Sequence, residues 1–133
     1  MKRLFIALAL AVCCAVPCWG NDVGISSLDY LVDGKNYIDK PTTINRCNVH
    51  NAASSFLSCY VYPNIDTLTN VGNIIIDGDT LRRDDLRKAL NMCFGSGVID
   101  KCWVNISGTP FKGTLGGPNS PEIRNAQLQW LNP

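Results

Sequence analysis

The 133-residue sequence contains a single histidine, His50, although histidine is the most frequent general acid or base in enzymes. A general base needs a positioned nucleophile or acid beside it, and no Ser-His-Asp grouping is recognisable around His50. Asn48 and Asn51 instead place His50 in a predicted hairpin turn, with an exposed side chain. Acids without an obvious partner are Asp66, Asp77, Asp100 and Glu122. We therefore expect no enzymatic activity, and a small hydrolase using His50 is the weakest of the alternatives.

Long apolar runs are also scarce, and residues 4–16 form the only one in the sequence. This run is too short for a bilayer, which needs about 20 residues. Lys2 and Arg3 precede it, Pro17 ends it, and Cys18 and Gly20 supply small residues before a cut. We predict a cleaved signal peptide over 1–20, with a helical leader, and a periplasmic or secreted protein without a membrane span. The alternatives are an uncleaved anchor and a lipoprotein cut before Cys13.

An excess of charge of one sign is absent. The formal net charge is +1, and removal of Lys2 and Arg3 leaves ten basic and eleven acidic side chains. Bulk attraction to nucleic acid or to an anionic membrane is therefore not expected. The sequence has no repeat, no low-complexity tract and no second domain, so we expect a loose segment over 21–27 and a single domain over 28–133.

Cysteines, in contrast, are frequent, with seven in the sequence. Four remain after removal of residues 1–20: Cys47, Cys59, Cys93 and Cys102. An even number in an exported chain favours two disulfides. Of the three possible pairings we prefer Cys47–Cys59 and Cys93–Cys102, each stabilising the fold by about 3 kcal/mol. A four-thiolate zinc site is the alternative, but spacings of twelve and nine are not those of zinc ribbons. We expect no metal and no cofactor.

The hydrophobic pattern predicts a mainly β domain with one clear helix. Leu86, Ala89, Leu90 and Cys93 form the apolar stripe of that helix, which is expected to begin at Asp79 or Thr80. A short helix capped by Ser27 precedes the strands. The predicted strands are 42–49, 56–62, 73–77, 102–109 and 123–131.

The order of three strands, a helix and two strands resembles the OB-fold, a five-stranded Greek-key barrel with its helix between strands three and four. Residues 37–40 resemble the lead-in of such domains, and residues 104–108 resemble the end of their fourth strand. The chain is similar to small bacterial periplasmic OB-fold proteins of undefined role. It departs from them at Asp39 and Arg46, where glycines are common in that family.

Alternation within the second predicted strand divides its residues between two faces. One face carries Leu57, Cys59 and Val61, and the other carries an aromatic stripe with Phe56, Ser58, Tyr60 and Tyr62. The resemblance implies that the outer face of the barrel binds ligands, and stacking on an aromatic ring contributes about 1–3 kcal/mol per base. Phe56, Tyr60, Tyr62 and Trp103 are the candidate ligand-binding residues. In the alternative, Tyr30 and Leu31 of the N-terminal segment cover this stripe.

Few basic residues flank the stripe, with only Arg46 in the first strand. The expected partner is therefore an unknown protein or saccharide outside the cytoplasm, and nucleic acid is not expected. The leading hypothesis is a non-catalytic binding or accessory module. The second is a secreted inhibitor or immunity protein that acts through the Gly- and Pro-rich loop 112–121.

Two charged motifs have simple structural interpretations. The basic residues of the helix are expected to be solvated, offset by Asp84 and Asp85, with Asp84 reaching Lys88. The triplet Asp77-Gly78-Asp79 resembles the start of a calcium loop but lacks the later ligands, which favours a turn that leads into the helix.

Overall fold

The computed structural model describes residues 24–50, 53–64, 66, 69–95 and 97–131. The predicted signal peptide and the first half of the predicted loose segment lie outside the described residues, as does part of the predicted turn at 51–54. Within the described residues, no helix is both long and apolar enough to span a membrane.

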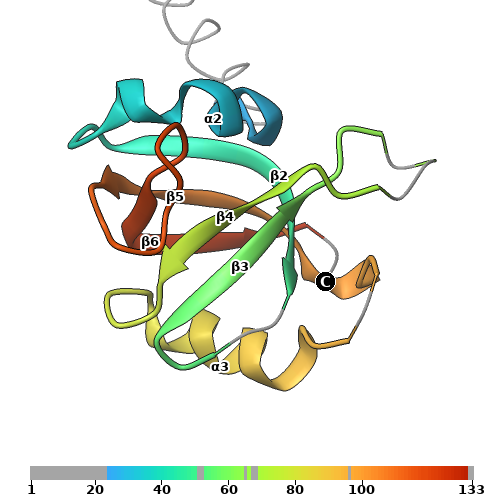
Figure 1. Ribbon diagram of the computed structural model, residues 1–133. Helices are drawn as coiled ribbons and strands as arrows, with labels where there is room; N and C mark the ends of the chain where they lie inside the picture. Colours follow the sequence, from blue (N-terminus) through green and yellow to red (C-terminus); the bar gives the residue numbers. More distant parts are fainter. Residues whose placement is uncertain (1–23, 51–52, 65, 67–68, 96, 132–133) are drawn as a thin grey trace, which may run out of the picture.

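Five strands close into a mixed barrel in the order β2–β3–β4–β6–β5, and β5 pairs back with β2 (Figure 1). Only β4 and β6 run parallel within the barrel, and the short β1 adds to β2 in parallel. The mainly β prediction is therefore confirmed. The strands are β1 (Ile25–Ser26), β2 (Thr42–His50), β3 (Phe56–Val61), β4 (Gly72–Asp77), β5 (Trp103–Phe111) and β6 (Glu122–Trp130). The helical segments are α2 (Ser27–Asp33), η1 (Gly34–Tyr37), α3 (Arg83–Met92) and η2 (Asp100–Cys102).

The two helices lie at opposite ends of the barrel, with α2 at one end and α3 at the other (Figure 1). Tyr30 of α2 is fully buried, and its hydroxyl donates to the Pro121 carbonyl oxygen at 2.6 Å. Leu86 and Ala89 of the predicted stripe are buried, while Leu90 is 37% exposed. The barrel interior is aliphatic and includes Ile44, Val49, Leu57, Val61, Ile74, Ile76, Val104, Ile106, Ile123 and Leu128.

Both preferred disulfides form, Cys47–Cys59 between β2 and β3 and Cys93–Cys102 from the end of α3 to η2. All four cysteines are fully buried. Cys59 is paired with Val49 in the ladder, so Cys47 and Cys59 are diagonal neighbours on the inner face. Two disulfides in a domain of this size are typical of proteins that work in an oxidising environment.

Three non-glycine residues of the described ranges adopt left-handed backbone angles, and they lie where the chain bends. Asp39 (φ 64°) and Arg46 (φ 61°) occupy the two positions where the OB-fold resemblance leads one to expect glycine. At Arg46 the β2–β5 register shifts between Ile44 and Cys47, which is the signature of a bulge. Asn125 (φ 54°) interrupts the alternation of β6, so the neighbours Arg124 and Asn125 are both exposed although Ala126 is buried.

The clear helix begins later than predicted, because residues 77–80 form a turn of their own. The Asp77 carboxylate accepts hydrogen bonds from the Asp79 backbone and the Thr80 hydroxyl, and α3 begins only at Arg83. The turn interpretation of the calcium-like triplet is thus confirmed. No cluster of three metal-ligating side chains occurs in the part of the chain that the structure describes.

Candidate binding site

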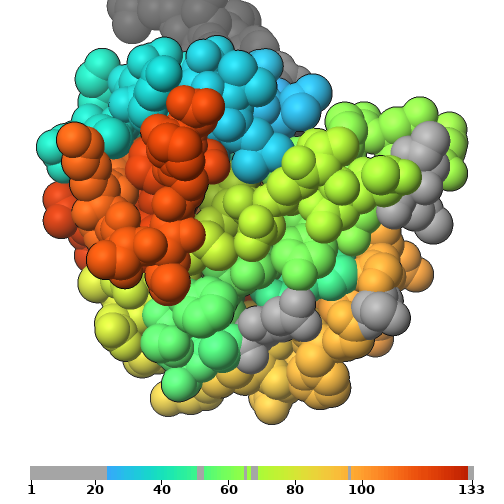
Figure 2. Space-filling model, in the orientation of Figure 1, coloured from blue at the N-terminus to red at the C-terminus, as the bar shows by residue number. Residues whose placement is uncertain are grey.

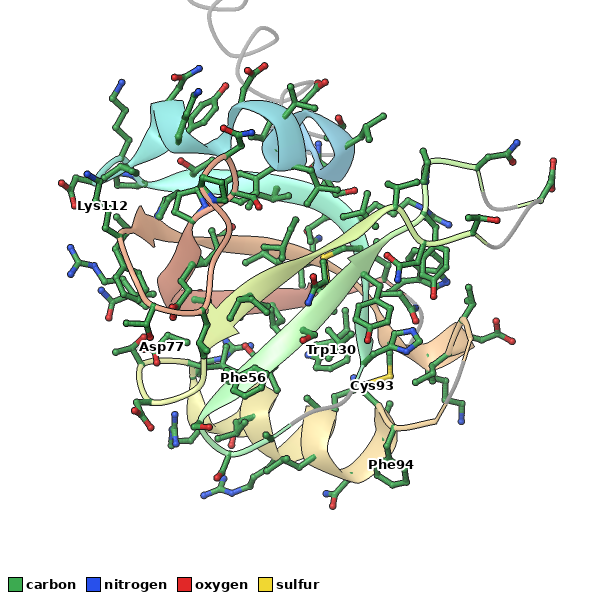
Figure 3. The ribbon with its side chains drawn as sticks, viewed as in Figure 1. Phe56, Asp77, Cys93, Phe94, Lys112 and Trp130 are labelled. Carbon is green, nitrogen blue, oxygen red and sulfur yellow. A yellow bond between two sulfur atoms is a disulfide. The ribbon has the colours of Figure 1, made fainter. Side chains whose placement is uncertain are left out.

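Three of the four predicted ligand-binding residues meet on the outer wall of the barrel, and the fourth does not. Tyr60 lies in β3 and Tyr62 directly follows the strand, whereas Trp103 begins β5 on the other side of β2. The ring centroids of Tyr62 and Trp103 lie 5.9 Å apart in an edge-to-face arrangement. Phe56 lies at the other end of β3, opposite Asp77 and about 13 Å along the strand from Tyr60 (Figure 3).

The cluster contains one residue that the sequence did not assign to it, His50. Its ring stacks on Tyr60 with centroids 4.4 Å apart and an interplanar angle of 6°, and it lies 6.3 Å from Tyr62. His50 ends β2 and is 1% exposed, so its prediction as an exposed turn residue was wrong. The cause is cross-strand packing, which a pattern of asparagines around a histidine does not reveal.

The environment of His50 favours its neutral form. Burial lowers the pKa of His50, and a hydrogen bond with the Gly95 backbone opposes this in part. Its Nε2 atom is buried and has no hydrogen-bond partner among the described residues. The stacked contact with Tyr60 makes the His50 ring a packing group of this cluster.

The segment between Cys93 and Cys102 covers the outer side of β2. The Asn48 side-chain amide donates to the Ile99 carbonyl and its oxygen accepts from the Ile99 backbone N–H, both at 2.9 Å. Asn48 is fully buried as a result. The Cys93–Cys102 disulfide therefore holds this segment, which we call the flap, over β2. In the sequence, the nine-residue spacing of the two cysteines was the only sign of the flap.

Arg46 supplies a cation at the edge of the cluster. Its guanidinium lies 4.7 Å from the Trp103 ring centroid, in cation–π contact. The bulged backbone of Arg46 is held on both sides, because its N–H donates to Asn105 and its carbonyl accepts from Ser27. Arg46 makes no ion pair within the described residues, so its guanidinium is available to an anion.

Beside Arg46 lies a shallow depression of about 340 Å³, which Tyr62 also lines. Burial and the neighbouring Tyr60 raise the pKa of Tyr62, so its hydroxyl stays protonated. The other lining residues are Ser26, Ser27, Leu28, Asn45 and Pro63. We call Arg46, Tyr60 and Tyr62, backed by His50 and Trp103, the aromatic–arginine surface.

The N-terminal segment does not cover the stripe in the way the alternative supposed. Tyr30 is in the core, and Leu31 reaches Gly72 at the start of β4. Both side chains close the end of the barrel, and among the residues described only the α2 start approaches the surface, through Leu28 beside Tyr62. Tyr60 and Tyr62 are partly exposed, whereas Trp103 is 4% exposed and supports the surface from below.

The predicted inhibitory loop 112–121 is fastened to the rest of the molecule. The Asn119 carbonyl accepts from the Lys35 backbone, and the buried Glu122 carboxylate accepts from the Leu115 backbone at 2.6 Å. In Figure 2 the loop packs against the α2–η1 segment. This anchoring counts against a loop that inserts into an enzyme, although the Leu115 side chain is exposed.

The charges of α3 pair differently from the prediction. Asp84 pairs with Arg87 at 2.9 Å rather than with Lys88, whose ammonium lies over the Trp130 ring. Asp85 is not solvated but buried, and it accepts from the Leu128 backbone and the Trp130 indole while pairing with Arg82. This acid fastens α3 to β6.

Comparison of the chain with protein families, curated proteins and solved structures finds no match.

Proposed function

We propose that this protein is an exported, non-catalytic binding or accessory module that holds a saccharide or protein through the aromatic–arginine surface. The observation that carries the proposal is the convergence on one wall of the barrel of Tyr60, Tyr62 and a stacked Arg46, which makes no ion pair with any described residue. Partly exposed rings offer flat apolar area, and a fixed guanidinium offers paired donors to a carboxylate.

We also propose that the barrel is of the OB type. The support is its strand order, with the parallel β4–β6 pair, closure by β5 on β2, and α3 between the third and fourth barrel strands. In such barrels the outer face of the second and third strands is the usual ligand platform. Tyr60 and Tyr62 belong to the second barrel strand and its continuation.

Export to the periplasm or the medium rests on the pattern of residues 1–20 and on the two disulfides. A single Arg46 beside the rings gives too little positive charge for tight binding of nucleic acid. The non-catalytic assignment rests on the single histidine, whose ring is used in stacking on Tyr60.

The experiment compares the oxidised protein with Tyr60→Ala/Tyr62→Ala and with Arg46→Gln on a glycan array and in pull-downs from extracellular extract. We expect both variants to lose at least tenfold in binding of whatever the wild type captures, at unchanged circular dichroism. Phe94→Ala is the matched control, because Phe94 is 64% exposed and lies outside the surface. Equal binding by all four proteins would refute the proposal.

A further inference from the structure

A cleft of about 670 Å³ lies between η1 and the loop 112–121. Its lining combines two lysines, glycine backbone and three apolar residues. We propose that this cleft binds a small carboxylate-bearing ligand of the uronic-acid class, a single sugar ring with one carboxylate. The lining residues are Lys35, Asn36, Ile38, Lys112, Gly113, Gly116, Gly117, Pro118 and Pro121.

The walls of the cleft are held in place before any ligand arrives. The Lys35 backbone donates to Asn119, and the Tyr30 hydroxyl donates to Pro121, so η1 and α2 hold the far end of the loop. The near end folds back on Glu122, whose carboxylate accepts from the Leu115 backbone. A preformed cleft spares a ligand the entropic cost of ordering a loop.

Glycines allow this fold-back and leave the cleft open. A Cβ at Gly113 would lie 2.2 Å from the Glu122 carboxylate, and one at Gly116 would lie 2.6 Å from the Glu122 nitrogen. Side chains are therefore excluded at both positions. The backbone itself forms that wall of the cleft, as is common where a ligand approaches the main chain closely.

The charges of the cleft favour an anion. Lys35 and Lys112 are exposed, are far apart in the sequence and converge on one recess, and neither makes an ion pair within the described residues. Among the described residues, no acidic side chain lines the cleft. Glu122 lies directly behind Gly113, so the local balance is about one positive charge, which suits a monoanion better than a polyanion.

The uncharged lining favours an organic body over a bare ion. Ile38, Pro118 and Pro121 present C–H surface, and the Asn36 amide offers both a donor and an acceptor. A sugar ring has C–H faces and hydroxyl edges that match these groups. The cleft volume falls within the range of about 300–1,000 Å³ that is typical of small-molecule sites.

This cleft is distinct from the aromatic–arginine surface. Trp103 begins β5 and Lys112 directly follows its last residue, so the two sites lie at opposite ends of a strand about 26 Å long. Figure 3 places Lys112 at the edge of the barrel where the loop leaves β5. Binding at the cleft therefore does not depend on the proposed function of the other surface.

The experiment titrates the oxidised protein with D-glucuronate and with D-glucose, which differ by the carboxylate, and follows backbone amide shifts by NMR. We expect saturable shifts with glucuronate at the amides of Gly113, Gly116 and Gly117, and at least tenfold weaker binding of glucose. Lys35→Met/Lys112→Met should weaken glucuronate binding at least tenfold. Lys40→Met/Lys101→Met removes the same charge outside the cleft and should leave the affinity for glucuronate within twofold of the wild-type value.

Three results would overturn the proposal: no saturable shift at the three glycine amides, equal binding of glucose, or equal weakening by both lysine pairs. Shifts in the wild type test the site even if a variant is poorly folded. Tyr60→Ala/Tyr62→Ala should bind glucuronate like the wild type, so failure of the cleft and failure of the aromatic–arginine surface give different results.

Discussion

At the scale of single residues, Asp85 shows how one buried polar group can fasten two elements. It is 2% exposed, and its two oxygens accept from the Leu128 backbone, the Trp130 indole and the Arg82 guanidinium. A buried carboxylate is stable only when it is fully hydrogen-bonded, and here the partners come from β6 as well as from its own helix. Composition gives no sign of this role.

We predict that Asp85→Ala destabilises the protein by about 3 kcal/mol, because it leaves the buried backbone and indole donors without an acceptor. Urea denaturation monitored by the fluorescence of Trp103 and Trp130 measures the change. Asp84→Ala is the matched control, one residue away on the same helix with an 84% exposed side chain, and should cost less than about 0.5 kcal/mol. Equal losses for the two variants would contradict the role assigned to Asp85.

His50 links a single residue to the pH dependence of the whole fold. Burial lowers the pKa of His50 below its ordinary 6.5, so the unfolded chain takes up the proton more readily than the folded one. The stabilisation is therefore complete above about pH 6.5 and declines as the pH falls below that value. His50 is the only histidine in the sequence, so its contribution can be isolated.

We predict that the wild type loses more unfolding free energy than His50→Phe between about pH 7.5 and about pH 5.5, where carboxylates remain ionised. Phenylalanine keeps the stacking on Tyr60 but does not titrate. Urea denaturation at the two pH values supplies the comparison, and NMR titration of the histidine ring supplies an independent check. A ring pKa at or above 6.5 in the folded protein would refute the explanation.

At the scale of elements, the flap between Cys93 and Cys102 decides which face of β2 is accessible. It covers Asn48 through two hydrogen bonds and contacts His50 through Gly95. We predict that Cys93→Ala/Cys102→Ala lowers stability by about 3 kcal/mol and loosens the flap. The ring pKa of His50, followed by NMR, should then rise toward 6.5.

Cys47→Ala/Cys59→Ala is the control for that experiment, because this bridge lies inside the barrel and does not hold the flap. It should destabilise the protein while leaving the pKa of His50 where it is in the wild type. If both pairs shift that pKa equally, the flap does not control the burial of His50.

Alternation along the strands predicted most of the elements because apolar side chains at every second position face the core, as do the fully buried Leu57, Cys59 and Val61 of β3. It failed where one residue adopts a left-handed conformation, since Asn125 reverses the phase of β6. The start of α3 was misplaced because the Asp77 side chain stabilises a local turn ahead of the helix. Both errors come from short-range chemistry that hydrophobic periodicity does not record.

At the scale of the whole molecule, the aromatic face was predictable but its composition was not. The period of two placed Tyr60 and Tyr62 outside the barrel, and Trp103 on the corresponding face of β5. Strand register decides which residues belong to the aromatic–arginine surface. It brings His50 into contact with Tyr60 and leaves Phe56 at the far end of β3. The cleft at η1 was missed altogether, because Lys35 and Lys112 meet only through tertiary packing.

The cysteines connect the stability of the molecule with the compartment in which it can fold. A domain of about 113 residues is typically stable by about 5–15 kcal/mol, and two bridges that contribute about 3 kcal/mol each are a large part of that. A form with free thiols should therefore be marginal or unfolded. A fold that depends on its bridges is expected to reach an oxidising compartment before it matures.

We predict that the full chain, expressed in a bacterial host with a general secretion pathway, is recovered from the periplasm or medium as residues 21–133 without a free thiol. Intact mass before and after alkylation measures both properties, since each free thiol adds one alkyl group. The same residues made in the cytoplasm should bind four alkyl groups and melt far lower, and oxidation should restore the melting temperature. Retention of residues 1–20, or a lipid-modified product that begins at Cys13, would contradict the proposed cut and support one of the two alternatives.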